Sequence, residues 1–331
     1  MLFGRRTEAA RIDRLLSAAR EGDSGVLVLR GEAGIGKTSL LRQGARAAEA
    51  AGLRVRRVCG WEPERGIGFA GLSQLVRADP RLLARLPGVQ ASALRGAVAL
   101  GPARAADRFG VCAATLTHIA HLSADRPLLL VVDDAHALDT PSLEALAFAA
   151  RRLMTECVVM LLATRPEPAV DRLLTALPVL APAPLDERAV AAVVADRTGV
   201  PAPPEVCRQL TASTGGNPMA LIEVVSGLTA EQLGGAAPMP PRVTAGATAE
   251  ALFAGRVGAL GAGARTLLLL MAVADDGARD VSAAARVLSL PASVYPEAER
   301  SGLVSCGPAA HAFTHPLVPA AVLTATPPDQ R

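Results

Sequence analysis

Short apolar runs separated by longer amphipathic stretches dominate the first half of the chain. The runs predict strands at residues 26–29, 53–58, 128–132 and 157–163. The last two contain only apolar residues, which is typical of strands buried on both faces of a parallel sheet. Two prolines interrupt residues 179–185 and limit that segment to a short edge strand.

Apolar residues at helical spacing predict helices next to these strands, at residues 7–20, 39–48, 108–122 and 142–153. Residues 60–71 form a predicted loop that carries the single tryptophan of the chain. Strands that alternate with helices indicate an α/β domain with a parallel sheet.

The second half of the chain is mainly helical. We expect an α/β domain over residues 1–185, a helical domain over 186–240 that ends in a Gly/Pro-rich linker, and a third domain over 241–331. In the third domain, helices precede two short strands, which favours a winged-helix arrangement. The helices of the second domain are predicted at residues 186–198, 205–213 and 219–228. Those of the third domain are predicted at 245–260, 263–274, 282–288, 294–301 and 317–324, and its two strands at 303–306 and 312–314.

A phosphate-binding pattern lies between the first strand and the following helix. Residues 31–38 read G-x-x-x-x-G-K-T, the P-loop motif, in the strand–loop–helix context that the motif requires. Lys37 is the only lysine among 34 basic residues, so a plain glycine-rich turn is the weaker interpretation. We expect Lys37 to reach the β- and γ-phosphates of ATP or ADP. The expected nucleotide ligands here are Gly31, Ala33, Gly34, Ile35, Gly36, Lys37, Thr38 and Ser39.

Acidic residues follow the strand at 128–132. Asp133 and Asp134 stand where a buried parallel strand ends, which predicts a carboxylate for Mg²⁺ at the sheet edge. We expect Thr38 and Asp133 to bind Mg²⁺, and Asp134 to orient the attacking water. The alternative is a strand that ends in a solvated turn.

Two further candidates remain open on the residues alone. Arg165 follows the strand at 157–163 and is expected either to reach the γ-phosphate as a catalytic residue or to lie in a surface loop. His118 and His121 have the spacing of a metal pair, but no third ligand lies near them in sequence, which favours an ordinary helical role.

Composition narrows the class of protein. The net charge is +3 without a basic block, so no nucleic-acid surface is indicated. The five cysteines are widely spaced, which argues against a zinc site or a disulfide framework and suits a reducing cytosol. We expect a cytoplasmic protein, because no signal peptide is evident and the longest apolar run, residues 267–274, is far too short to span a membrane.

Five motifs together resemble one family. They are residues 31–38, 133–136 (Asp-Asp-Ala-His), 163–165 (Ala-Thr-Arg), 216–218 (Gly-Asn-Pro) and 313–318 (Phe-Thr-His-Pro-Leu-Val). The chain is similar, over essentially its whole length, to the STAND-type AAA-like ATPases. The match is best to the nucleotide-binding part of large LuxR-family (LAL, MalT-like) transcriptional activators. The resemblance implies an AAA-like P-loop NTPase core followed by a helical lid and a winged helix.

The resemblance also implies site residues beyond the P-loop. Arg5 matches the family's G-R-E opening near the adenine, although Arg6 replaces the glutamate here. Arg165 matches the sensor arginine, and Pro218 matches the proline that lies against the adenine. His315 is analogous to a winged-helix histidine that contacts the β-phosphate of ADP; the alternative is a buried histidine packed under Pro316.

Three functions compete at this point. The resemblance favours a nucleotide-operated switch, a slow ATPase that regulates a LuxR-family activator and self-associates with ATP. Family members usually continue to a C-terminal helix-turn-helix, so we expect DNA contact only through a part absent from this chain. The alternatives are a stand-alone AAA-type motor ATPase or P-loop kinase, and a binding module without hydrolysis.

Overall fold

The computed structural model describes residues 2–101, 108–239, 247–274, 278–306, 311–314 and 318–326. Beyond the first three residues, the chain divides into an N-terminal unit, Gly4–Pro182, and a C-terminal unit, Ala183–Arg331. This boundary lies three residues before the one expected at 185. The further division expected at 240 stays a prediction.

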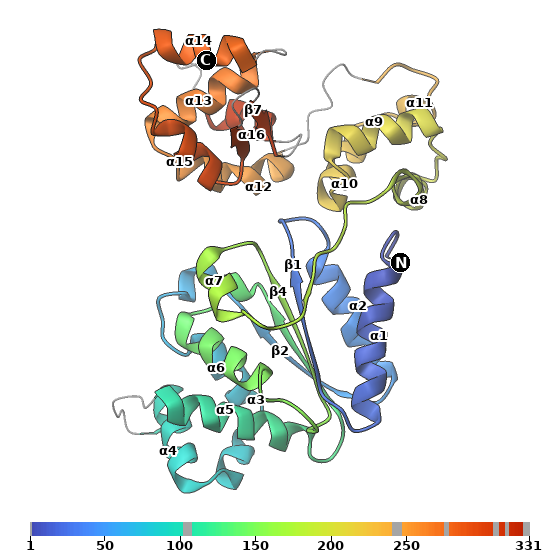
Figure 1. The fold of residues 1–331 in the computed structure, drawn as a ribbon. Coiled ribbons are helices and arrows are strands. Elements are labelled where there is room, and N and C mark those ends of the chain that lie inside the picture. Colours follow the sequence, from blue (N-terminus) through green and yellow to red (C-terminus); the bar gives the residue numbers. More distant parts are fainter. Residues whose placement is uncertain are drawn as a thin grey trace. The chain divides into compact units, whose positions relative to one another are not determined.

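The N-terminal unit is built on a five-stranded parallel sheet (Figure 1). The strand order is β2-β3-β4-β1-β5, so β3, β4 and β1 each have a strand on both sides. All five predicted strands are present, and β5 is the short edge strand that its prolines allow. Their bounds are β1 Gly25–Arg30, β2 Arg54–Cys59, β3 Leu128–Asp133, β4 Val158–Thr164 and β5 Val179–Leu180.

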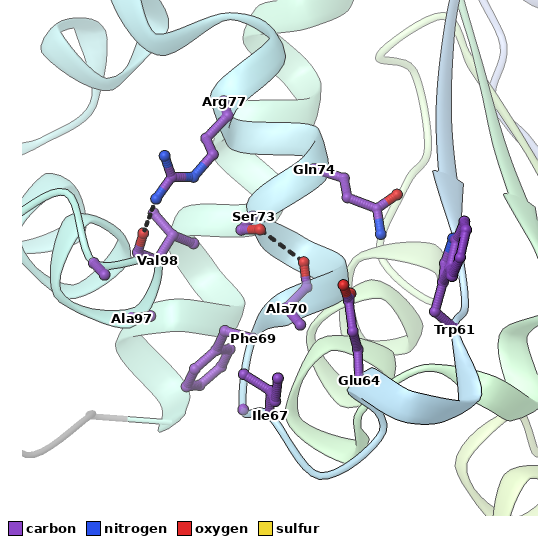
Figure 2. Close-up of a pocket in the computed structure, with 12 residues that line it drawn as sticks. Trp61, Glu64, Ile67, Phe69, Ala70, Ser73, Gln74, Arg77, Ala97 and Val98 are labelled. Atoms are coloured by element: carbon purple, nitrogen blue, oxygen red, sulfur yellow. Dashed lines mark hydrogen bonds between the residues drawn. The ribbon is translucent and has the colours of Figure 1, made fainter.

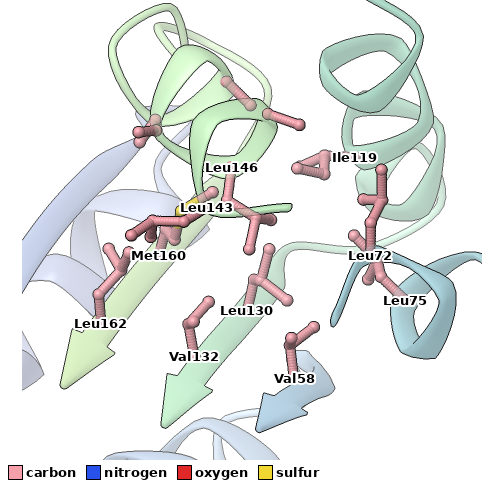
Figure 3. Packing of buried hydrophobic residues seen from close by; sticks show 14 of the residues in the cluster. Val58, Leu72, Leu75, Ile119, Leu130, Val132, Leu143, Leu146, Met160 and Leu162 are labelled. Carbon is pink, nitrogen blue, oxygen red and sulfur yellow. The ribbon is translucent and has the colours of Figure 1, made fainter. Parts of the chain in front are cut away.

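Alternate side chains of the central strands enter two separate cores. On β3, Leu130 and Val132 point into one core, and Leu129 and Val131 belong to the other. Figure 3 shows the first core, in which Leu130 and Val132 pack with residues of the covering helices such as Leu146. Every residue of β4 is buried. The continuous apolar runs therefore reflect burial on both faces of the sheet.

Helices cover both faces of this sheet (Figure 1). Helices α1 and α2 pack on one face, and the longer connections between β2 and β5 supply the helices of the other. Short 3₁₀ turns η1, η2 and η3 lie within these connections. The bounds are α1 Arg6–Arg20, α2 Lys37–Ala50, η1 Glu62–Glu64, α3 Ala70–Ala78, η2 Pro80–Arg85, α4 Gly88–Ala97, α5 Arg108–Ser123, η3 Ala135–Ala137, α6 Thr140–Ala150 and α7 Pro168–Leu173.

The C-terminal unit has one continuous hydrophobic core, whose buried residues run from Leu185 to Val322. The two short strands pair antiparallel, as their positions predicted. The helix expected at 282–288 begins four residues earlier, at Ala278. Bounds are α8 Glu187–Thr198, α9 Pro204–Thr214, α10 Pro218–Ser226, α11 Ala230–Leu233, α12 Ala247–Gly258, α13 Ala262–Val273, α14 Ala278–Val287, α15 Val294–Arg300, β6 Val304–Cys306, β7 His311–Phe313 and α16 Val318–Ala325.

The Gly-Asn-Pro motif has a clear local role in the C-terminal unit. Gly216 adopts φ +66°, and a Cβ there would lie 2.5 Å from the Leu185 carbonyl oxygen, so only glycine fits. The Asn217 side chain caps α10 by accepting hydrogen bonds from the N–H groups of Met219 and Ala220. Pro218 occupies the first turn, where no N–H is needed.

None of the helices that the structure describes is long and apolar enough to cross a membrane.

One buried carboxylate joins two helices on the core face. Asp139 is 2% exposed and caps α6 by accepting a hydrogen bond from the Ser142 N–H at 2.9 Å. It also accepts from the N–H groups of Phe69 (2.7 Å) and Gly71 (2.9 Å), where α3 begins. Phe69 has the left-handed φ of +63°, so these bonds hold a backbone turn that the residue itself disfavours.

Replacing Asp139 with alanine would leave three backbone donors without their acceptor. We expect Asp139→Ala to destabilise the N-terminal unit by about 3 kcal/mol, the sum of a lost cap and unpaired buried groups. Urea unfolding followed by Trp61 fluorescence would measure this change, because the single tryptophan lies in this unit. Asp125→Ala, a change at a largely exposed side chain, should cost under about 0.5 kcal/mol. Equal effects for the two variants would contradict the assignment.

Candidate functional site

The parallel sheet brings the predicted site residues to one edge. Arg30 pairs with Thr164, and Val132 with Leu162, so β1, β3 and β4 end at nearly the same level. The Gly31 N–H donates to the Thr164 carbonyl at 3.2 Å, which fixes the start of the P-loop beside the end of β4. Asp133 ends β3 at the same edge.

The P-loop backbone requires its glycines. Gly34 and Gly36 have φ values of +77° and +102°, which L side chains rarely adopt. At Gly31 a Cβ would lie 3.1 Å from Cγ2 of Ile35. Helix α2 begins at Lys37, directly after Gly36. The loop therefore places the N-terminus of a 14-residue helix, with its unpaired N–H groups, at the sheet edge.

Lys37 is held inside this loop. It is 7% exposed, and its Nζ donates to the carbonyl oxygens of Gly31 and Glu32, both at 2.8 Å. Burial, and then the nearby charge of Arg165, lower the pKa of Lys37 from 10.5 to about 8. The printed hydrogen bonds of this ammonium go to neutral carbonyl oxygens, and a phosphate would be a stronger partner for it.

Thr38 and the two acids form the oxygen-rich side of the site. The Thr38 hydroxyl donates to Oδ1 of Asp133 at 3.2 Å, and the Asp134 N–H donates to the same oxygen at 3.0 Å. Burial, together with the adjacent Asp134 charge, raises the pKa of Asp133. Asp134 adopts a left-handed φ of +46°, which turns the chain after the strand. Its side chain is 45% exposed.

Arg165 lies within electrostatic range of this cluster. Its charge lowers the pKa of Lys37 and, after burial, that of His136. His136 Nδ1 lies 4.0 Å from Oδ1 of Asp134. Lys37, Asp133, Asp134 and Arg165 therefore share one site, as the sequence predicted from separate motifs.

Arg5 holds the backbone of the P-loop through a hydrogen bond that the sequence did not predict. Its guanidinium is buried, donates to the Ile35 carbonyl at 2.7 Å and pairs with Glu8 at 3.1 Å. A contact with the adenine stays a prediction for Arg5. No sequence pattern indicates the hydrogen bond from Arg5 to Ile35, because the two residues are thirty positions apart.

The residues present fit a Mg²⁺ nucleotide. The hydroxyl of Thr38 and the carboxylate of Asp133 are hard oxygen donors of the type that Mg²⁺ prefers. Burial and then the adjacent charge of Asp134 raise the pKa of Asp133, and a divalent cation bound there would oppose both effects. The glycine backbone leaves the room that phosphate oxygens need, and Lys37 supplies a cation beside them.

The contacts expected for Pro218 and His315 stay predictions, and His118 is an ordinary buried residue. Pro218 begins α10 in the C-terminal unit. His315 lies outside the described residues. His118 is fully buried in α5, where burial lowers its pKa to about 4. Within the described part of the chain, no three His, Cys, Asp or Glu side chains gather as a metal site.

The family model of the AAA ATPase domain matches residues 1–162. The N-terminal unit is therefore similar to AAA ATPase domains over most of its length. No curated protein matches the chain in sequence. Nucleotide binding is expected for an AAA domain, and the P-loop, Asp133 and Asp134 all lie inside the matched residues.

One solved structure supports this fold, and two others are similar at lower scores. A Walker-type ATPase of Pyrococcus abyssi is 14% identical with a TM-score of 0.61, and the match covers 97% of this chain and 96% of that chain. A STAND protein with a tetratricopeptide repeat sensor from Pyrococcus horikoshii is 18% identical with a TM-score of 0.44; the match covers 96% of this chain but only 42% of that one. Cdc6p from Pyrobaculum aerophilum is 14% identical with a TM-score of 0.46, over 98% and 94% of the chains.

The lowered pKa of Lys37 predicts how pH affects nucleotide binding. Above pH 8 the buried amine loses its proton in the free protein, whereas bound phosphates raise its pKa again. ATP affinity should therefore fall as pH rises above 8, by up to about tenfold per pH unit, with uptake of a proton on binding.

Titration of a fluorescent ATP analogue from pH 6.5 to 9.5 would measure the affinity, and calorimetry in two buffers of different ionisation heat would measure the proton uptake. Lys37→Gln serves as the control, since its weaker binding should not change over this range. A flat profile for the unmodified protein would show that Lys37 does not titrate here.

Proposed function

We propose that this chain is a nucleotide-operated switch, a slow Mg²⁺-dependent ATPase that belongs to a LuxR-family transcriptional activator. The observation that carries the nucleotide part is the hydrogen bond between Thr38 of the P-loop and Asp133 of β3. It joins the two sequence motifs that an ATPase needs into one oxygen-rich site beside Lys37. The motifs at 133–136, 163–165, 216–218 and 313–318 support the regulatory part.

Each residue has a defined task in the proposed reaction. The N–H groups of the P-loop and the Lys37 ammonium bind the phosphates. Thr38 and Asp133 would hold Mg²⁺, which would supply positive charge beside the phosphates. Asp134 accepts a hydrogen bond from water and orients it toward the γ-phosphorus. Water then adds as the bond to the β–γ bridging oxygen breaks, giving ADP and phosphate. Arg165 stabilises the charge that develops on the γ-phosphoryl group.

In this proposal the C-terminal unit senses which nucleotide is bound. Pro218 lies against the adenine, and His315 contacts the β-phosphate of ADP and keeps the winged helix closed. ATP in place of ADP releases that contact and permits self-association, and hydrolysis resets the switch. Contact with DNA would belong to a C-terminal part of the regulator. Sequence resemblance is the support for each of these steps.

The first experiment identifies the nucleotide carried by freshly purified protein by chromatography. We expect ADP in stoichiometric amount, and none in Lys37→Ala. Arg42→Ala, on the exposed side of the same helix, should keep its ADP. Protein that binds neither ADP nor ATP at millimolar concentration would refute the proposal. Turnover above about 1 s⁻¹ would favour a motor enzyme instead.

Asp134→Asn tests the hydrolytic role. Asparagine tolerates the left-handed backbone of Asp134, so the loop should keep its shape. We expect phosphate release to fall by about 10²-fold or more, with ATP affinity changed by less than about threefold. A steady-state phosphate assay and an equilibrium titration would measure the two quantities. Unchanged phosphate release would indicate a binding module whose Asp134 takes no part in chemistry.

A further inference from the structure

A second pocket lies in the N-terminal unit, away from the P-loop motif. It has a volume of about 510 Å³, which lies within the usual range for small-molecule sites. Figure 2 shows its walls: Trp61 on one side, Ala97 and Val98 on the other, and Ile67 and Phe69 between them. Trp61 and Ile67 are 62% and 58% exposed, a high solvent exposure for large apolar side chains.

The charges around the pocket indicate the chemistry of its ligand. Arg77 stands beside Val98 and donates to its carbonyl oxygen at 3.3 Å (Figure 2). Among the described residues no carboxylate pairs with Arg77, so its remaining N–H groups can bind an anion. Glu64 lies on the Trp61 side (Figure 2). An anionic group therefore belongs at the Arg77 side and an apolar body against Trp61, Ile67 and Phe69.

The pocket wall is attached to the loop that carries Asp133 and Asp134. Gln74 lines the pocket, and its amide forms two 2.9 Å hydrogen bonds with the backbone N–H and C=O of Cys59. The next N–H, of Gly60, donates to the Asp133 carbonyl at 2.9 Å. A Cβ at Gly60 would lie 2.1 Å from the Asp134 carbonyl oxygen, so the two backbones are in direct contact.

Two further attachments join the same wall to the site. The carboxylate of Asp139, five residues after Asp134, holds the backbone of Phe69 and Gly71. Arg65 forms an ion pair with Glu167, two residues after Arg165. These hydrogen bonds and this ion pair connect the pocket wall to the segments that carry Asp134 and Arg165.

We propose that this pocket is an effector site for a small apolar molecule carrying one anionic group, and that its occupancy changes nucleotide affinity at the P-loop. The proposal of a binding site rests on the pocket and on Arg77 alone. The regulatory part rests on the proposed function, because it requires that the P-loop binds nucleotide.

The binding experiment uses 8-anilinonaphthalene-1-sulfonate, an aromatic anion, with energy transfer from Trp61 as the signal. Because Trp61 is the only tryptophan, it is the single donor for this signal, and the variants described below place the probe at the pocket. Naphthalene-2-carboxylate should compete, and the uncharged naphthalene-2-carboxamide should compete at least about tenfold less well, the loss expected for one charge-assisted hydrogen bond. Equal competition by the two compounds would overturn the anion site.

Matched variants separate this site from general surface binding. Arg77→Gln should weaken probe binding about tenfold or more, whereas Arg81→Gln, an exposed arginine outside the pocket, should not. Glu64→Gln should bind the probe at least as well as the unmodified protein, because a like charge is removed. Probe binding that is the same for Arg77→Gln and Arg81→Gln would overturn the proposal.

The coupling experiment measures ADP affinity with and without saturating naphthalene-2-carboxylate. We expect a change of about fivefold or more, with ADP altering the affinity of the carboxylate by the same factor. Arg65→Gln should bind the carboxylate normally but show a smaller coupling factor. Normal carboxylate binding with unchanged ADP affinity would refute the regulatory part alone. Absent nucleotide binding with intact energy transfer from Trp61 would refute the proposed function and leave the pocket standing.

Discussion

The parallel pairing of β1, β3 and β4 is the constraint on which the site depends. Each of these strands has a strand on both sides and an apolar core above and below, so polar side chains are confined to the strand ends. Parallel direction then places all three carboxyl ends at one edge. The P-loop, Asp133 and Arg165 meet because the interior of the sheet excludes them from every other position.

This confinement also sets the electrostatics of the edge. Burial and the nearby charge of Arg165 lower the pKa of Lys37, whereas burial and the adjacent charge of Asp134 raise the pKa of Asp133. Lys37 is buried, whereas Arg165 is exposed and the Asp134 side chain is 45% exposed. A nucleotide with its Mg²⁺ brings negative phosphates to the cations and a positive ion to the acids. The site therefore has its charges arranged for a ligand of both signs.

Sequence patterns were sufficient for the sheet and for the segments that follow its strands, whereas the roles of the site residues stay predictions. Buried strands must be apolar throughout, and phosphate-binding turns must contain glycine at fixed spacing. Both features can therefore be recognised within one continuous stretch of sequence. Asp139 also carried a local signal, since an aspartate before Thr140 and Pro141 is a typical helix cap. Its second task, holding Phe69, was not predictable, because that bond joins residues seventy positions apart.

The same limit explains the other residues that were missed. The Arg5 clamp on Ile35, the Gln74 amide on Cys59 and the Arg65 pair with Glu167 each join distant segments, and none belongs to a motif. The start of α14 was misplaced by four residues, although Ala278, Val281 and Ala285 follow a helical apolar spacing. Local patterns specify elements, whereas such contacts depend on how the elements pack.

Gln74 has a consequence for how the sheet ends. β2 is an edge strand, and an edge strand normally offers unpaired N–H and C=O groups to other chains. At Cys59 the amide of Gln74 supplies the donor and acceptor that a sixth strand would have provided. Arg54, Arg56 and Arg57 add charge along the same strand. The open side of the sheet is thereby protected from strand addition and aggregation by a side chain that imitates a peptide group.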